Sequence, residues 1–167
     1  MQTQPVAERP LLPDGYVEEE KLGPLLPWSH VEERLAEAIN LWFVTADRRG
    51  MPHVSPLWAV WVDDHLYFDG SPESKRVRNM KENPHMAVHL ESGENVLMMY
   101  GTGEEIVGAP LELRERLAAE YKRKYVEQEY APDPAWWAEG GLYKMTVSKV
   151  IAWTAFLKDP TRWRLKA

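Results

Sequence analysis

The sequence predicts a mainly β, α+β fold: a six-stranded antiparallel barrel with helices at its periphery. About six segments are rich in β-forming residues, and three others have helical character. These segments do not follow the strict strand–helix alternation of a parallel doubly wound sheet. Most consecutive strands are joined by short turns and can pair as hairpins, which favours an antiparallel barrel.

The composition bounds the class of protein. With 167 residues, 44% of them hydrophobic, the chain is long enough for one domain with a sizeable core. Its formal net charge of -6 argues against a nucleic-acid partner, and the absence of cysteine excludes disulfides and thiolate chemistry. No signal-peptide pattern and no membrane-spanning apolar run are present. We therefore expect a cytoplasmic protein without a membrane partner.

The N-terminal part is expected to form an arm and a helix. Residues 1–27 contain five prolines, which indicates an extended arm lying over the surface or over a partner subunit. The barrel domain is then expected to comprise residues 28–167. Ser29 and Glu32 fit a capping box at the start of a helix. The residues expected along one face of this helix are Val31, Leu35, Ala38 and Ile39.

The first strands surround the segment on which the rest of the prediction depends. Residues 41–46 are rich in β-forming residues and are expected to form a strand, followed by turn residues that end in Gly50. Residues 54–62 are apolar on both faces, which predicts a central strand covered on both sides. Pro56 lacks an N–H, so we expect a bulge or a gap in the ladder where a ligand can dock. A short strand follows at residues 66–68.

A short basic helix is expected to begin near Ser74, after a break at residues 70–72. Lys75, Arg76 and Arg78 lie within its first two turns. Free backbone N–H groups and side-chain cations converge at such a helix start, which makes it a good anion site. We hypothesise that it holds the phosphate of a flavin-type cofactor. The alternative is that these cations form an ordinary solvated helix face.

The second half of the chain adds three strands and the longest helix. Strands are expected at residues 86–90, 96–107 and 142–157. Apolar residues recur every fourth position in the helix at 110–130, which predicts one buried face. The loop at 131–141 carries Trp136 and Trp137, and such loops commonly cover a pocket or a partner. Thr161-Arg162-Trp163-Arg164 closes the chain.

Three motifs in this order resemble the pyridoxamine 5'-phosphate oxidase-like superfamily, whose fold is the FMN-binding split β-barrel. The first is D-x-x-G-x-P-H-V-x-P-L-W at residues 47–58. The second is Y-F-x-x-x-x-x-S-K-x-x-R-N-M-x-x-N-P at residues 67–84. The third is T-R-W-R at residues 161–164, after a strand that contains Ala152-Trp153. The helix expected at residues 110–130 and the T-R-W-R segment most resemble the branch of the superfamily that includes users of the deazaflavin F420.

The resemblance implies a cofactor site between two copies of the chain. The isoalloxazine ring would lie against the backbone of Ser55, Pro56, Leu57 and Trp58, and the phosphate would lie by Ser74, Lys75 and Arg78. Family members often carry a serine–threonine pair where this chain has Asp69 and Gly70, and Ser71 would replace the missing hydroxyl. In the family's homodimer, Trp153, Arg162 and Trp163 would complete the partner's site.

The resulting functional hypothesis is an oxidoreductase that uses FMN or F420 on a small organic substrate. The cofactor would perform the redox chemistry, so no acid–base dyad is required, and the catalytic residues and the substrate stay undefined. No histidine spacing suggests a metal site. The alternative is a non-catalytic protein that binds or stores flavin or haem. Four tryptophans, expected to be exposed in a monomer, favour a homodimer: Trp136, Trp137, Trp153 and Trp163.

Overall fold

The computed structural model describes residues 5–156 and 158–165, which form nine strands, three α-helices and three short 3-10 helices. The strands are β1 (Ala7–Glu8), β2 (Leu41–Ala46), β3 (Pro52–Leu57), β4 (Ala59–Val62), β5 (His65–Asp69), β6 (His85–His89), β7 (Val96–Glu105), β8 (Leu142–Trp153) and β9 (Thr161–Arg164). The helices are α1 (Trp28–Glu37), α2 (Lys75–Glu82) and α3 (Leu111–Lys124), with 3-10 turns η1 (Glu19–Lys21), η2 (Val126–Gln128) and η3 (Pro134–Trp137). Residues 1–4, 157 and 166–167 lie outside this description, including the predicted end of the last long strand at Leu157.

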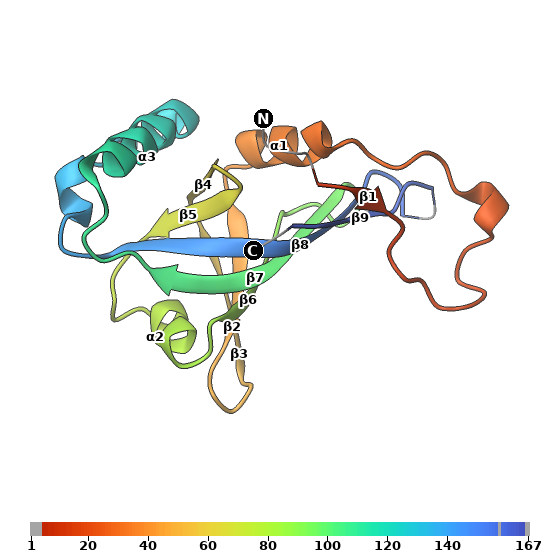
Figure 1. Ribbon diagram of the computed structural model, residues 1–167, viewed down its shortest axis with the longest axis horizontal. Helices are drawn as coiled ribbons and strands as arrows, with labels where there is room; N and C mark the ends of the chain where they lie inside the picture. Colours follow the sequence, from red (N-terminus) through yellow and green to blue (C-terminus); the bar gives the residue numbers. More distant parts are fainter. Residues whose placement is uncertain (1–4, 157, 166–167) are drawn as a thin grey trace.

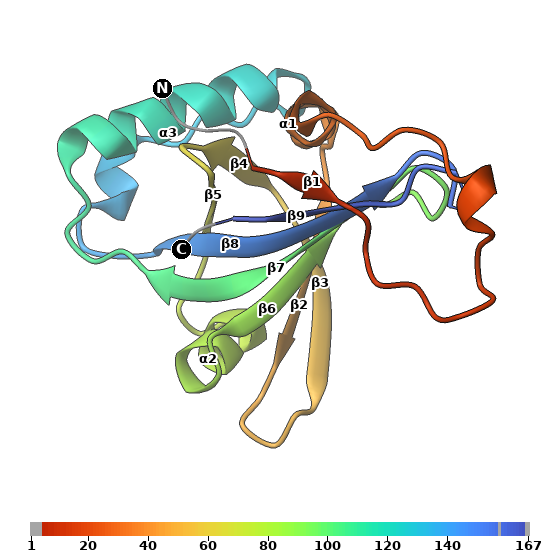
Figure 2. The ribbon, with the colours of Figure 1, turned by 45° about the vertical axis from the view of Figure 1, so that its right-hand side comes forward.

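All the strands belong to one antiparallel sheet that curls into a split barrel, which confirms the predicted fold class, although the sheet has nine strands and not the predicted six. The order is β1-β9-β8-β7-β6-β2-β3, and β5 pairs with both β4 and β8. β8 holds the sheet together: its first part pairs with β5 and its last part with β9, while β7 follows its other edge. The sheet is not closed into a continuous hydrogen-bonded ring. Figures 1 and 2 show this curl, with the helices outside it.

The predicted central strand at residues 54–62 is two strands. β3 pairs with β2 up to Leu57, and β4 pairs with β5 from Ala59 onward, so the ladder changes sides at Trp58. β3 is the last strand of the order, and its side chains alternate between exposed and half-buried. The expected cover on both faces is therefore wrong for β3, although Ala59 and Val60 of β4 are fully buried. An apolar pattern does not show which edge of a strand pairs with a neighbouring strand.

The bounds of α1 and α3 differ from the sequence prediction. Pro27 is the residue before α1, no side chain caps this helix, and Ser29 lies inside it, so the predicted capping box is wrong. Proline restricts its own φ and suits a helix entry, and the buried Trp28 follows it directly. α1 ends at Glu37, before Ala38 and Ile39. α3 likewise ends at Lys124 and not near residue 130.

Two hydrophobic clusters hold the helices to the sheet. The first fills the barrel and includes Phe43, Phe68 and Trp163. The second lies between the sheet and α3 and includes Tyr121 and Tyr125. In Figure 1, α3 and α1 lie above the sheet and α2 lies below it. No helix in the described part of the chain is both long and apolar enough to cross a membrane.

The N-terminal arm is attached to the C-terminal strand. β1 pairs with β9, and the Glu8 carboxylate accepts hydrogen bonds from Arg162 (2.8 Å) and Arg164 (3.0 Å). Residues 161–164 are thus a paired strand. Trp163 and Trp137 are buried, with 0% and 2% of their surface exposed, so their predicted exposure is wrong. Burial of these two rings comes from contacts between segments distant in sequence, such as Trp163 on Trp28 at 5.7 Å.

Candidate cofactor site

The helix start at which the sequence predicts an anion site is present, and no side chain caps it. Ser74 is the residue before the helix, its backbone is extended, and its side chain caps no N–H group. The Ser74 hydroxyl oxygen is buried and has no hydrogen-bond partner within the described residues. The first N–H groups of a helix have no acceptor inside it. At the start of α2 these N–H groups therefore stay available to a ligand, together with the unpartnered hydroxyl of Ser74.

Two cations flank this helix start. Lys75 and Arg78 are exposed, and neither forms an ion pair with another described residue. The hydrogen bond from Met51 N–H, followed by smaller effects that include the charge of Lys75, lowers the pKa of Asp47. Lys75 therefore lies near the turn between β2 and β3. Both cations are free to pair with an added anion.

Ser71 lies in the turn that leads into α2. Its carbonyl oxygen accepts the N–H of Ser74 (3.1 Å), and its hydroxyl oxygen accepts the N–H of Glu73 (3.2 Å). Ser71 is exposed. Its hydroxyl proton can still be donated, because a hydroxyl both donates and accepts.

Arg76, the third cation of the predicted basic helix, points inward. Its side chain is half-buried, and its guanidinium occupies the space that a side chain at Gly70 would need. Burial lowers the pKa of Arg76, while the charge of nearby Asp69 raises it. Arg76 Nε and the Tyr143 hydroxyl are both buried without a hydrogen-bond partner in the described chain. Gly70 was the signal in the sequence, since a residue without a side chain leaves room for this arginine.

Packing fixes α2 against the sheet. Val77 and Met80 are buried, and Asn79 Nδ2 donates a buried hydrogen bond to Thr45 Oγ1 of β2 (3.2 Å). At the other end of the helix, Lys81 pairs with Glu105 of β7 (3.0 Å). α2 also packs against β3. The predicted anion site would therefore lie on a rigid element beside the edge of the sheet.

β3 offers backbone groups next to this helix. Since β3 pairs only with β2, its other edge has no strand partner in the described part of the chain. Ser55 lies opposite the buried Phe43, and the Ser55 hydroxyl oxygen is buried without a partner. Leu57 packs against the barrel core, and Pro56 is exposed. The predicted ring-binding backbone at residues 55–57 is thus an open strand edge near the start of α2.

The side chain of Trp58 turns toward α3. Its ring stacks on Tyr125 with centroids 5.0 Å apart, and Tyr130 lies edge-on at 5.2 Å. Asp69 is turned to the same side, where it accepts hydrogen bonds from Tyr130 OH (2.7 Å) and Trp137 Nε1 (3.3 Å). Because the ring is packed on this side, Trp58 can contribute only its backbone to the predicted ring-binding edge next to β3. The hydrogen bonds from Tyr130 and Trp137 hold the Asp69 carboxylate on this side.

The remaining predicted site residues form a second group on β8 and β9. Trp153 ends β8 and lies edge-on to Phe156 at 5.1 Å. Arg162 is paired with Glu8, and Trp163 is fully buried. The structure of one chain does not bring these three residues to the start of α2. No group of three or more metal-ligating side chains occurs among residues 5–156 and 158–165.

The family follows from a comparison with known sequence families. The family model described as pyridoxamine 5'-phosphate oxidase matches residues 28–154, and the chain belongs to this family. The match spans the barrel from α1 to the end of β8. It includes the start of α2 and β3, but not the arm or β9. No curated protein matches the sequence.

Solved structures share the fold at low sequence identity. An F420 reductase is 20% identical, with a TM-score of 0.53 over 83% of this chain and 98% of that chain. An FAD-binding protein from Mesorhizobium loti is also 20% identical, with a TM-score of 0.56 over 84% and 96%. A haem storage protein from Vibrio cholerae is 15% identical, with a TM-score of 0.58 over 74% and 92%. The fold thus occurs in an enzyme and in a storage protein.

Proposed function

We propose that this protein is an oxidoreductase that binds FMN or F420 and reduces or oxidises a small organic substrate. The observation that carries the proposal is the open edge of β3 beside the uncapped start of α2. Family membership supports a flavin-type cofactor, and the F420 reductase and the FAD-binding protein of the same fold support it further.

The residues around α2 fit the phosphate of such a cofactor. The N–H groups of the first turn and the unpartnered Ser74 hydroxyl would donate hydrogen bonds, while Lys75 and Arg78 would supply charge. Ser71 would add a hydroxyl at the rim. The open edge of β3 at residues 55–57 would hold the ring through its peptide groups. When bound, the cofactor would supply hydride transfer, and the protein would position it and exclude water.

We also propose a homodimer, with the outer face of the sheet as its interface. A row of paired residues crosses this face from β3 to β8: Pro56, Trp42, His89, Met98 and Ile151. None of these five side chains is buried, and Trp42 stacks on His89 with an angle of 7° between the rings. A second copy packed here would cover the row. It would also allow Trp153 and Arg162 to approach the partner's cofactor.

Titration of the purified protein with FMN and with F420, followed by calorimetry, tests the proposal. We expect one of the two cofactors to bind, and failure of both to bind would refute the cofactor assignment. Turnover with a nicotinamide nucleotide or another reductant then separates an enzyme from a storage protein.

The haem storage protein of the same fold supports a second candidate function, the storage of a cofactor without catalysis. Its haem version would need an axial ligand, which the histidines, the tyrosines or the methionines could offer. His89 is half-buried and bonded to Leu90 O through Nδ1 (2.8 Å), so Nε2 stays available. An absorbance spectrum distinguishes haem from flavin and deazaflavin.

A further inference from the structure

Residues 9–27, 154–156 and 158–160 together form a protrusion at one end of the molecule, which we call the arm protrusion. Figures 1 and 2 show the N-terminal loop extending beyond the sheet beside the turn that joins β8 to β9. The pairing of β1 with β9 fixes the point where the arm leaves the barrel. The family match does not include the arm, and the proposed cofactor site does not use it.

Hydrogen bonds hold both ends of the arm to the β8–β9 turn. Arg9 Nη1 donates to Pro160 O (2.9 Å), and the N–H of Gly23 donates to Lys158 O (2.6 Å). The N–H of Leu26 donates to Thr161 Oγ1 of β9 (2.9 Å). The prolines of the arm further restrict its backbone. The arm protrusion is thus preorganised, which lowers the entropic cost of docking.

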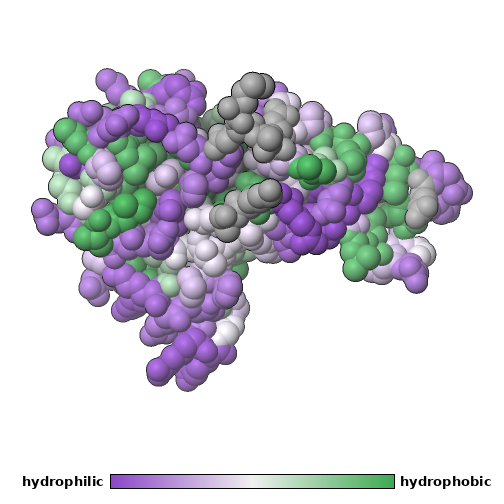
Figure 3. Space-filling view, viewed as in Figure 1, coloured by the Kyte–Doolittle hydropathy of each residue, from purple (hydrophilic) through white to green (hydrophobic). Residues whose placement is uncertain are grey.

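Among the described residues, large apolar side chains of the arm protrusion stay exposed. Leu11 is 90% exposed and Tyr16 57%, and the Tyr16 ring lies edge-on to Phe156 at 5.7 Å. The arm also surrounds a hollow of about 800 Å³, lined by residues that include Leu12 and Leu22. Figure 3 shows apolar side chains gathered at this end of the molecule. Exposed apolar patches of this kind mark interaction surfaces.

The charge of the arm protrusion indicates which surface it can contact. Asp14 and Glu20 are exposed and form no ion pair with another described residue. Opposite charge lies on the turn between β2 and β3, where Arg48 and Arg49 are exposed and likewise unpaired within the described chain. Met51, beside them, is 64% exposed. An acidic, apolar protrusion and a basic turn with an exposed apolar residue are complementary.

We propose that the arm protrusion of one protomer docks over the β2–β3 turn of a second copy of this chain. The two surfaces lie apart in both ribbon views, with the arm at the right and the β2–β3 turn at the bottom, so one chain does not join them by itself. In a two-fold dimer each contact occurs twice. The inference rests on the homodimer proposed above. It adds that the arm covers the partner's β3 edge and the start of α2, and so limits access to the cofactor.

Cross-linking tests this contact without any cofactor. Because the chain has no cysteine, Leu11→Cys and Met51→Cys introduce unique thiols. The two variants are co-expressed with different tags and treated with a short bifunctional maleimide. We expect a covalent dimer that carries both tags. The control pairs Leu11→Cys with Val126→Cys, a 65% exposed residue after α3, and equal yields from the two pairs would overturn the inference.

A charge exchange provides a second test. Asp14→Arg with Glu20→Arg should weaken dimerisation about tenfold, and adding Arg48→Glu with Arg49→Glu should restore it. A dissociation constant that does not change, or that does not recover, would contradict the proposed contact. A monomer in light scattering would refute the homodimer itself. A dimer without the Leu11–Met51 cross-link would refute only the role of the arm, whatever the outcome of the cofactor titration.

Discussion

Lys75 and Lys81 lie on the same short helix and have different surroundings. Lys81 pairs with Glu105, whose other oxygen accepts the N–H of Gly141 (3.2 Å). The Glu105 carboxylate thus joins the end of α2 to the start of β8, and its pKa is lowered chiefly by the hydrogen bond from Lys81. Lys75 has no such partner among the described residues. Its charge is therefore available to a ligand.

Replacing Lys75 with Ala should weaken binding of the phosphorylated cofactor by about tenfold to a hundredfold. One charge-assisted hydrogen bond contributes roughly 1.5–3 kcal/mol, and about 1.4 kcal/mol corresponds to a factor of ten. Stability should change by no more than about 0.5 kcal/mol, because Lys75 is exposed. Calorimetric titration measures the affinity.

Lys122→Ala on the exposed side of α3 is a suitable control for this experiment. Lys81→Ala, two turns along α2, should also leave the affinity unchanged, but it removes the ion pair with Glu105. If Lys75→Ala and Lys122→Ala bind the cofactor equally well, the phosphate does not lie at α2.

Gly101 lies where β7 and β8 change register. A Cβ at this position would collide with the carbonyl oxygen of Thr146 on β8, a backbone atom that has no alternative rotamer. Gly101→Ala should therefore force the strands apart and reduce the free energy of unfolding by about 1–3 kcal/mol. Gly93→Ala is the matched control, since no atom lies within 4 Å of its Cβ. Urea unfolding measures the free energy of unfolding, and an equal loss in both variants would contradict this account.

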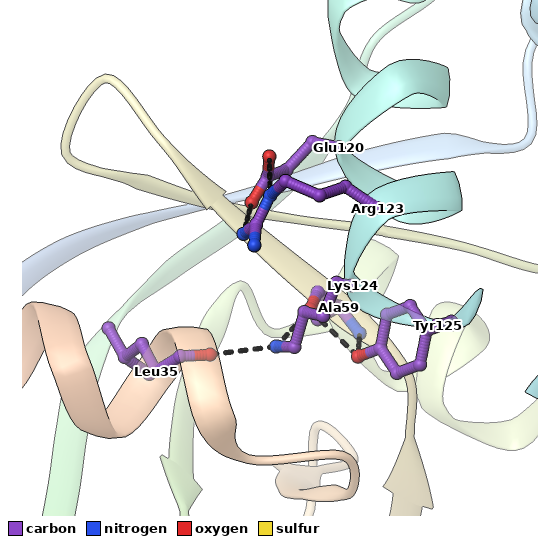
Figure 4. Close-up of polar contacts among 6 residues, drawn as sticks. All are labelled: Leu35, Ala59, Glu120, Arg123, Lys124 and Tyr125. Atoms are coloured by element: carbon purple, nitrogen blue, oxygen red, sulfur yellow. Dashed lines mark hydrogen bonds and ion pairs between the residues drawn. The ribbon is translucent and has the colours of Figure 1, made fainter. Parts of the chain in front are cut away.

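At the scale of elements, a buried lysine attaches α3 to the rest of the molecule. Lys124 Nζ donates to Leu35 O at the end of α1 (2.8 Å) and to Ala59 O on β4 (2.9 Å), as Figure 4 shows. The Tyr125 hydroxyl accepts the N–H of Ala59 (2.8 Å). Both residues lie at the C-terminal end of α3, where a cation also interacts favourably with the helix dipole. Two side chains thus hold three elements together.

This lysine should make stability depend on pH. Burial lowers the pKa of Lys124 to about 8, below the value of about 10.4 expected in an unfolded chain. Between these values the unfolded chain binds more protons, so the contribution of Lys124 to stability rises with pH, by up to about 3 kcal/mol. Lys124→Met removes the titrating group. The wild type should therefore gain stability relative to this variant between pH 7 and pH 10, as denaturant unfolding measures, and parallel pH profiles would contradict the assignment.

At the scale of the whole molecule, the outer face of the sheet is the proposed dimer interface. We expect light scattering to give twice the chain mass of 19.3 kDa. Trp42→Glu should shift the protein toward the monomer, because it places a charge within the proposed apolar interface. Trp136→Glu is the control, since Trp136 is 64% exposed on η3, outside this face. A dimer that survives Trp42→Glu unchanged would place the interface elsewhere.

The sequence by itself determined the local features of this protein. Ser74 and the cations behind it predicted a helix start at Lys75, which the structure confirms. The three motifs identified the family, and the β-forming segments predicted an antiparallel barrel. These features depend on backbone preference and on periodicity over a few residues, so neighbouring residues specify them.

Only the tertiary structure decided which strands pair and which side chains are buried. The apolar run at residues 54–62 does not reveal that the ladder changes sides at Trp58, because pairing depends on β2 and β5. The local sequence around Trp163 does not tell whether its ring is exposed or, as in this structure, packed on Trp28. Arg76 turns inward because Gly70 leaves space for it. Each outcome depends on contacts between residues far apart in the chain, and no local pattern records such contacts.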